Sequence, residues 1–403
     1  MMSTAATLVP ASASSTAAPS RAVGRIRSID ALRGLVILLM LVDHAREFFF
    51  IHAQVSDPMN VETTSPALFF TRLSAHLCAP VFVALTGLGA WLYGNKQAGG
   101  GNGAGAASAF LLKRGLFLVV LELTVVNFAW TFSITPELIY LQVIWAIGLS
   151  MIALAALVHL PRPVLIAVGL VIVLGHNLLD PITIAAGQPG HAIWAVLHDR
   201  GFIDLPSAIW GDAQARTSYP LLPWIGVAAL GYAIGPWFAG EQRTRLRRLV
   251  LTGVGALALF VVLRAINVYG DAPWAMQATL IQTVMSVLNL TKYPPSADFL
   301  LLTLGVGALI LAGLERAPDR LIGVLAVFGG APLFFYLIHL YGLHLLNLAA
   351  LMLFGANQGE GFGVPGVAWV WLLAALVAVP CWLACRWFGG VKRRSSQWWM
   401  KYL

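Results

Sequence analysis

Two histidines within apolar segments are the side chains of this sequence best suited to move a proton. His44 follows the apolar run 35–42, and His76 lies in the next apolar segment, 67–93. An imidazole with an ordinary pKa near 6.5 can remove a proton from a hydroxyl or an amine near neutral pH and return it later, as acyl transfer requires. We therefore predict His44 and His76 as candidate catalytic residues. The alternative is that both form hydrogen bonds between helices and do no chemistry.

Several charged side chains accompany these histidines. A charged side chain at the centre of a bilayer costs about 2.5 to 3.5 kcal/mol, so such groups should face protein or a wet cavity. Asp43 and Arg46 are three residues apart, and Arg72 and His76 are four apart, so each pair shares one face of a helix. Their depths predict one polar pocket on the non-cytoplasmic side, in which Glu122 is a candidate for orienting a histidine. The substrate-binding candidates are Asp43, Arg46, Arg72, Glu122, Lys292, Tyr293 and His339, the last with a purely lining role as its alternative.

Two arginines mark the opposite, cytoplasmic end of the first apolar segment. Arg27 and Arg33 flank the point at which this segment is expected to enter the membrane. They have a topological role, because positive charge anchors the cytoplasmic ends of spans. A second reading, compatible with the first, is that their guanidinium groups hold the phosphates of a cytoplasmic acyl donor.

Metal-ligand patterns are missing from the sequence. It contains no H-x-x-x-H or H-E-x-x-H motif, and the spacing of His339 and His344 does not place them on one helix face. We therefore expect no metal. The three cysteines, Cys78, Cys381 and Cys385, are expected to pack as small apolar residues.

Composition predicts a polytopic membrane protein. The 403-residue chain is 59% hydrophobic and 10% charged, with a mean hydropathy of +0.80. We predict an all-α bundle of about ten transmembrane helices in the lipid bilayer. Residues 25–390 form this domain, between a disordered cytoplasmic tail, 1–24, and a basic cytoplasmic tail, 391–403. The expected spans are 31–50, 67–93, 110–130, 138–159, 164–179, 221–238, 249–268, 299–314, 321–345 and 367–388.

The distribution of basic residues predicts the orientation. With the N-terminus in the cytoplasm, nineteen of the 25 Lys and Arg residues fall on the cytoplasmic side of these spans. This bias predicts that both termini lie in the cytoplasm. It also accounts for the net charge of +8 without nucleic acid, which we exclude as a partner.

Several motifs, in order along the chain, resemble those of the bacterial heparan-alpha-glucosaminide N-acetyltransferase catalytic-domain-like family. They are R-x-R-S-I-D-A-L-R-G at 25–34, D-H-A-R-E-F-F at 43–49, T-R-L-S-A-H-L-C-A-P-V-F-V at 71–83, L-Q-V-I-W-A-I-G at 141–148, Y-P-L-L-P-W-I-G-V at 219–227 and K-Y-P-P-S at 292–296. The resemblance implies a membrane acyltransferase that uses acetyl-CoA and a membrane histidine. The lysosomal namesake carries that histidine before its second span, where this chain aligns Pro66. His44, His76 or, with a gap, His52 would take the role.

Together these features predict an integral-membrane acyltransferase of the bacterial inner membrane. It would move an acyl group, most simply acetyl, from cytoplasmic acyl-CoA to a sugar, glycan or lipid-linked acceptor at the outer face. The alternative is a transporter or lipid flippase in which the buried charges form a proton or substrate path. The sequence leaves a homo-oligomer open.

Overall fold

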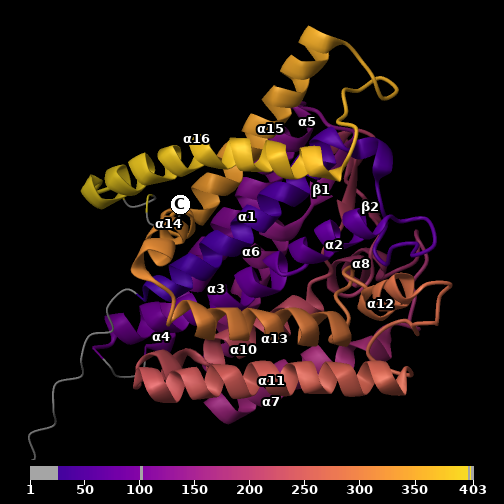
Figure 1. Ribbon diagram of the computed structural model, residues 1–403. Coiled ribbons are helices and arrows are strands. Elements are labelled where there is room, and N and C mark those ends of the chain that lie inside the picture. The colour runs from indigo at the N-terminus through magenta and orange to yellow at the C-terminus, as the bar shows by residue number, and fades with distance from the viewer. Residues whose placement is uncertain (1–25, 100–102, 398–399, 401–403) are drawn as a thin grey trace, which may run out of the picture.

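The computed structural model describes residues 26–99, 103–397 and 400. The expected tail 1–24, Arg25 and residues 398–399 and 401–403 of the C-terminal segment lie outside the described residues. Most of the described chain is helical (Figure 1). The helices are α1 (Arg27–Phe49), α2 (Pro66–Ala75), α3 (Cys78–Gln97), α4 (Ala104–Leu121), α5 (Asn127–Thr131), α6 (Val143–Leu157), α7 (Arg162–Gly175), α8 (His191–Leu197), α9 (Ser207–Trp210), α10 (Leu222–Ala233), α11 (Gln242–Ile266), α12 (Leu280–Leu288), α13 (Ala297–Leu314), α14 (Asp319–Gly329), α15 (Pro332–Phe354) and α16 (Val367–Arg394).

Helix α1 lies at the centre of the bundle. In Figure 1, α14, α15 and α16 lie on one side of it, and α13, α10, α11 and α7 lie on the other. Its closest partner is α14, and glycines allow this approach: a Cβ on Gly34 would lie 2.0 Å from the Leu325 carbonyl oxygen, and one on Gly329 would lie 1.8 Å from that of Asp30. Small residues at such crossings are typical of helices packed within membranes.

Six helical segments of the described chain are long and apolar enough to cross a membrane, judged by length and composition. Helix α1 is not among them, and it carries charged residues near both ends. The expected count of ten spans and the expected orientation therefore stay predictions. The six segments are Pro66–Gln97, Arg162–Leu179, Gln242–Ile266, Ala297–Leu314, Pro332–Phe354 and Val367–Arg394.

The structure corrects the expected elements in three places. The segment 67–93 is divided between α2 and α3. The segment 321–345 is divided between α14 and α15, where Pro332 begins a new helix, a position at which proline's missing N–H costs nothing. The segment 138–159 begins as a strand and becomes helical only at Val143.

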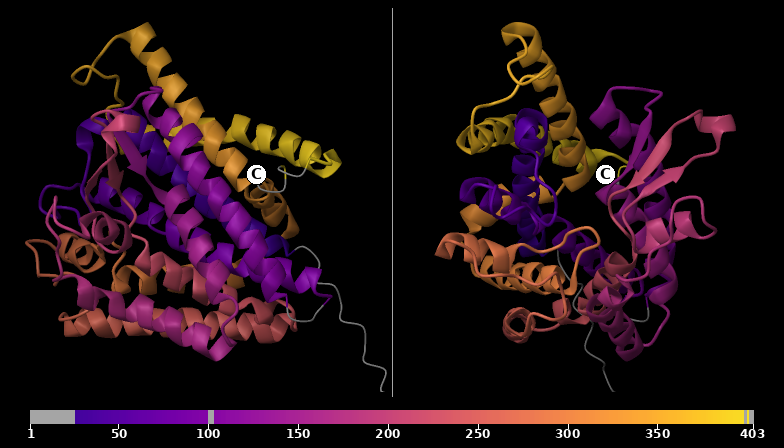
Figure 2. Two further views of the ribbon diagram at one scale, coloured as in Figure 1. Left: turned by 180° about the vertical axis from the view of Figure 1, so that it is seen from behind. Right: turned by 90° about the vertical axis from the view of Figure 1, so that its right-hand side faces the viewer.

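The structure is mostly helical, as expected, but it also contains a small sheet. Strand β1 (Leu138–Leu141) pairs in parallel with β3 (Gln214–Thr217), which pairs antiparallel with β2 (Phe202–Asp204). Ile139 and Ala215 pack with Trp145 at the start of α6. The sheet gathers with α8 and α12 at the end of the molecule where α1 finishes (Figures 1 and 2).

Candidate functional site

A large cavity of about 1900 Å³ follows α1 along its length. Helix α1 has 23 residues, which correspond to about 34 Å, comparable to the hydrocarbon thickness of a bilayer. The residues of α1 that line the cavity recur every three or four positions, so they form one stripe along the helix. This stripe comprises Asp30, Arg33, Ile37, Met40, His44 and Glu47. The cavity therefore joins the Arg27 end of α1 to its His44 end.

His44 lies in an aromatic setting on the wall of this cavity. Its Nδ1 atom is 2.8 Å from Nε2 of His339, and the two rings stack with centroids 5.0 Å apart. Trp130 and Tyr336 also contact the His44 ring, each in a T-shaped arrangement. His339 is fully buried and is not among the residues that line the cavity. His344 packs instead on Phe132, with ring centroids 3.9 Å apart.

These contacts fix which nitrogen of His44 carries a proton. Nδ1 of His339 is 2.7 Å from the Phe335 carbonyl oxygen, which can only accept, so this nitrogen must donate. In a neutral His339 the other nitrogen, Nε2, is then an acceptor, and His44 must donate to it through its Nδ1–H. His44 therefore keeps a lone pair on Nε2, which has no hydrogen-bond partner among the described residues. This is the tautomer that a general base needs.

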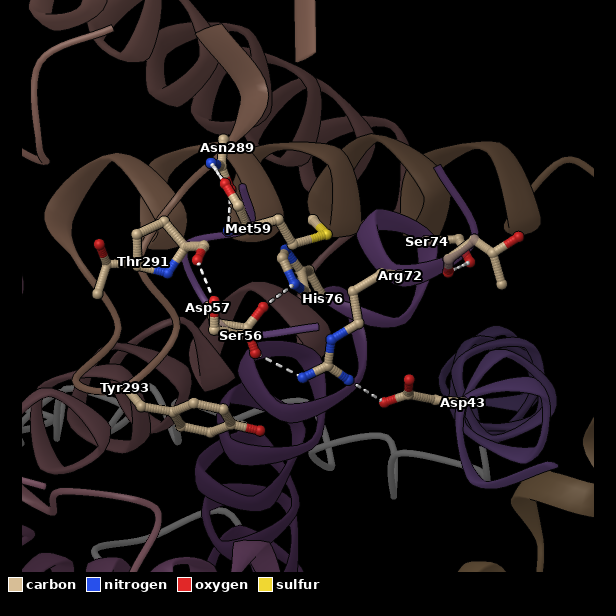
Figure 3. Close-up of polar contacts among 12 residues, drawn as sticks. Asp43, Ser56, Asp57, Met59, Arg72, Ser74, His76, Asn289, Thr291 and Tyr293 are labelled. Carbon is tan, nitrogen blue, oxygen red and sulfur yellow. Dashed lines mark hydrogen bonds and ion pairs between the residues drawn. The ribbon is translucent and has the colours of Figure 1, made fainter. Parts of the chain in front are cut away.

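A network of ion pairs begins at Asp43, the residue before His44. Figure 3 shows the part that runs from Asp43 through Arg72 and Asp57 to His76. Asp43 accepts from Arg46 Nε at 3.1 Å and from Arg72 Nη1 at 2.5 Å. Arg46 also donates to Gln54 and contacts Glu47. The predicted pair at i,i+3 is thus confirmed, and Arg72 joins α2 to α1. Both arginines are committed to carboxylates, and their guanidinium groups are almost fully buried.

His76 does not share the cavity with His44. It lies at the break between α2 and α3, packs on Phe299, and is not among the residues that line the cavity. Its Nε2 is 3.4 Å from Asp57 Oδ1, and Arg72 binds the other oxygen of the same carboxylate. The expected single pocket for both histidines is therefore corrected: Arg72 and Asp57 separate His76 from the cavity-lining His44.

Sequence reasoning missed Asp57. This residue belongs to the loop between α1 and α2, where no helical spacing relates it to a partner. Burial opposes its ionisation, but Arg72 and His76 outweigh burial and hold the pKa of Asp57 well below its usual range. Asp57 therefore remains a carboxylate that fixes both α2 side chains.

Glu122 lies away from the cavity, contrary to its expected place in the pocket. It begins a π-helical turn, Glu122–Val126, and is fully buried. Its Oε2 accepts from the backbone N–H of Trp145 at 3.1 Å. Helix N-termini have unpaired N–H groups, so Glu122 caps α6 and orients neither histidine.

Lys292 and Tyr293 lie at the His44 end of the cavity, as expected. The Tyr293 hydroxyl donates to that of Tyr219 at 3.3 Å, and the Lys292 ammonium lies 5.2 Å from the Tyr293 ring centre. Burial and Arg72 oppose charge on Lys292, but Tyr293, Asp43 and Asp57 leave its pKa raised. Lys292 is therefore a buried cation.

The Arg27 end of the cavity is rich in basic residues from four helices. Arg33 donates to Asp30 Oδ1 at 3.2 Å, one helical turn away, and Arg27 lies 3.3 Å from Asp319. The C-terminal turns of α16 extend this basic wall. The lining cations at this end are Arg27, Arg33, Lys96, Arg114, Arg386, Lys392 and Arg393. Such a wall suits a donor that carries several phosphates.

Metal binding has no geometric support in the described residues. They contain no group of three His, Cys, Asp or Glu side chains placed to hold a metal ion.

An apolar helical bundle with a long cavity and a buried histidine at one end defines an integral-membrane protein with a polar site between its helices. Residues 25–262 match the family described as "Heparan-alpha-glucosaminide N-acetyltransferase, catalytic", and the chain belongs to this family. Membership indicates a membrane acetyltransferase. The matched region includes His44 and His76, whereas Lys292, Tyr293 and His339 lie beyond it. A comparison with curated proteins gives no match.

Proposed function

We propose that this chain transfers an acetyl group from cytoplasmic acetyl-CoA to a hydroxyl or amine of a sugar, glycan or lipid-linked acceptor on the other side of a bacterial inner membrane. One observation carries the proposal: a single cavity connects the basic Arg27 end with His44. The donor phosphates would bind Arg33 and its neighbours. Arg33 and His44 are eleven positions apart on α1, a distance of about 16 Å, which the extended part of the donor would cover.

In the proposed reaction His44 acts as a general base. Its Nε2 takes the proton from the acceptor hydroxyl or amine while the acceptor oxygen or nitrogen attacks the thioester carbonyl. The carbon–sulfur bond then breaks, and the coenzyme A sulfur leaves with the proton that His44 returns. Arg46, Arg72 and Lys292 supply the positive potential that stabilises the developing oxyanion.

His339 would position His44 in this step. It accepts the Nδ1–H of His44, so it holds the ring with Nε2 directed to the reaction and stabilises the imidazolium that forms. His76 has no place in the step because it is not part of the cavity wall. This assigns the role of base to His44 alone.

The proposal is tested with the purified full-length chain in detergent, labelled acetyl-CoA and a sugar acceptor such as glucosamine. We expect His44→Gln to lower turnover about 100-fold or more, because general-base catalysis contributes at least this much. His159, an exposed histidine at the end of α6, provides the matched control as His159→Gln. Equal turnover of His44→Gln and wild type would exclude His44 as the base.

Continuity of the cavity is also the one observation that favours the second candidate function. A path lined by polar groups at both ends could carry a substrate across the membrane. Uptake of a labelled sugar or lipid into liposomes, driven by a pH gradient and independent of acetyl-CoA, would support a transporter. Transfer of label from acetyl-CoA without such uptake would support the acetyltransferase.

A further inference from the structure

The charges at the His44 end of the cavity do not balance. The carboxylates that line it are Asp43, Glu47 and Asp57, and all three contact Arg46 or Arg72. Three more lining cations stand outside this network: Lys292, Arg200 and Arg216. None of them has an ion pair with another described residue. This end of the cavity therefore carries a formal excess of two positive charges.

Two of the unpaired cations converge on one aromatic ring. The Arg200 guanidinium lies 4.9 Å from the centre of the Tyr293 ring, and the Lys292 ammonium lies 5.2 Å from it. Arg216 packs nearby on Phe202 of the adjoining strand β2, at 5.6 Å. Because these residues come from the α8–β2 loop, strand β3 and the loop before α13, separate parts of the chain bring positive charge to the same wall.

The position of Lys292 makes this arrangement unusual. The residue is only 4% exposed, yet no carboxylate of the described residues lies within ion-pairing distance of its ammonium. The carboxylates of Asp43 and Asp57 help to keep Lys292 charged, but each of them already pairs with Arg72. An anion that enters the cavity would therefore find its free ion-pair partners in Lys292 and Arg200.

We propose that the acceptor is anionic and carries a phosphate or carboxylate group that binds between Lys292 and Arg200 against Tyr293. Arg200 is exposed, whereas Lys292 and His44 are both buried. Arg200 would thus hold the anionic group from its exposed side and Lys292 from its buried side, with the reacting hydroxyl or amine directed to Nε2 of His44. This assignment of substrate class rests on the proposed acetyl transfer, but its binding step can be measured without a donor.

The test compares binding of glucosamine with binding of glucosamine 6-phosphate to the full-length chain in detergent. We expect the phosphorylated sugar to bind at least about tenfold more tightly, because one charge-assisted hydrogen bond contributes about that factor to the affinity. Arg200→Gln should remove most of this preference, and because Arg200 is exposed the variant should fold. Lys292→Met should also remove it, and Lys292→Arg should restore it. Arg248→Gln, an exposed cation outside the cavity wall, is the matched control.

A second arm identifies the source of the anion. The same titration is made in nanodiscs of phosphatidylcholine with and without phosphatidylglycerol. Competition by phosphatidylglycerol would assign the anion to a lipid headgroup. A preference for glucosamine 6-phosphate that persists in both kinds of nanodisc would assign it to a soluble glycan.

Equal binding of the two sugars, or a preference that survives both Arg200→Gln and Lys292→Met, would overturn the proposal. This outcome is separate from the acetyl transfer assay. If charge preference is lacking but His44-dependent transfer occurs, only the acceptor assignment fails. If the preference is present and no transfer occurs, the proposed reaction fails and the anion site remains.

Discussion

His44 Nδ1 and His339 Nε2 lie 2.8 Å apart, although 295 positions separate them along the chain. The Phe335 carbonyl makes His339 an acceptor at Nε2, so His339 selects the tautomer of His44. We predict that His339→Leu lowers the turnover number about 100-fold or more, because His44 can then place its proton on the wrong nitrogen.

His339→Gln provides the discriminating variant. A glutamine carbonyl can accept the same hydrogen bond, so this variant should regain part of the lost turnover and a wild-type pH–rate profile. Thermal unfolding of each variant checks that the bundle is intact. If His339→Leu and His339→Gln are impaired equally and only their stability changes, His339 is a packing residue.

The low pKa of Asp57 predicts that the folded protein loses stability in acid. Its pKa in the folded protein is held well below the usual range. A depressed pKa means that Asp57 contributes stability above its unfolded pKa of about 4 and that this contribution disappears as the pH falls toward the folded value. The melting temperature of wild type should therefore decline below about pH 4.

Asp57→Asn should remove this part of the acid response. Breaking a buried ion pair costs about 3 to 5 kcal/mol, so the variant should melt at a lower temperature at neutral pH and show a weaker decline below pH 4. Measurement of melting temperature against pH for both proteins tests this. Parallel curves would show that Asp57 is not the responsible carboxylate.

If the donor binds at the Arg27 end of the cavity, loss of a cation there should raise the KM for acetyl-CoA. Arg33→Gln removes a cation from the wall proposed to hold the donor phosphates, so KM for acetyl-CoA should rise about tenfold. The turnover number at saturating donor should change little, because Arg33 is about 16 Å from His44 along α1. Arg247→Gln, an exposed residue of α11 outside the cavity wall, is the control. An unchanged KM would show that the donor phosphates do not bind at this end of the cavity.

Membrane orientation can be tested by labelling single cysteines. The three native cysteines are buried and can be replaced by alanine. With both termini in the cytoplasm, Gln358→Cys, between α15 and α16, should react with an impermeant maleimide on intact cells. Gln242→Cys, at the start of α11, should react only after permeabilisation. Both side chains are exposed, so the opposite pattern would reverse the orientation.

Local spacing was the most reliable guide in the sequence. The i,i+3 positions of Asp43 and Arg46 predicted that both lie on one helix face, and the structure joins them in an ion pair, because one helix fixes both partners. The depth argument also brought Lys292 to the same end of the cavity as His44. The same argument could not predict the direction in which the His76 side chain points, because His76 lies at the break between α2 and α3.

Helical spacing gives no information about residues of irregular segments. Asp57 lies in a loop with no period, so nothing in the sequence relates it to Arg72. Glu122 was misplaced because a π-helical turn and the start of α6 together decide where its carboxylate points. The residues of strand β1 were predicted as part of the transmembrane segment 138–159, because a short apolar run does not distinguish a strand from a helix.

Direct measurement of acetyl transfer in a single turnover, with donor binding measured on the same samples, tests the central role of His44 most closely. His44→Gln should bind acetyl-CoA with wild-type affinity and transfer the acetyl group at least about 100-fold more slowly. Transfer at the wild-type rate by a folded His44→Gln protein would contradict the account.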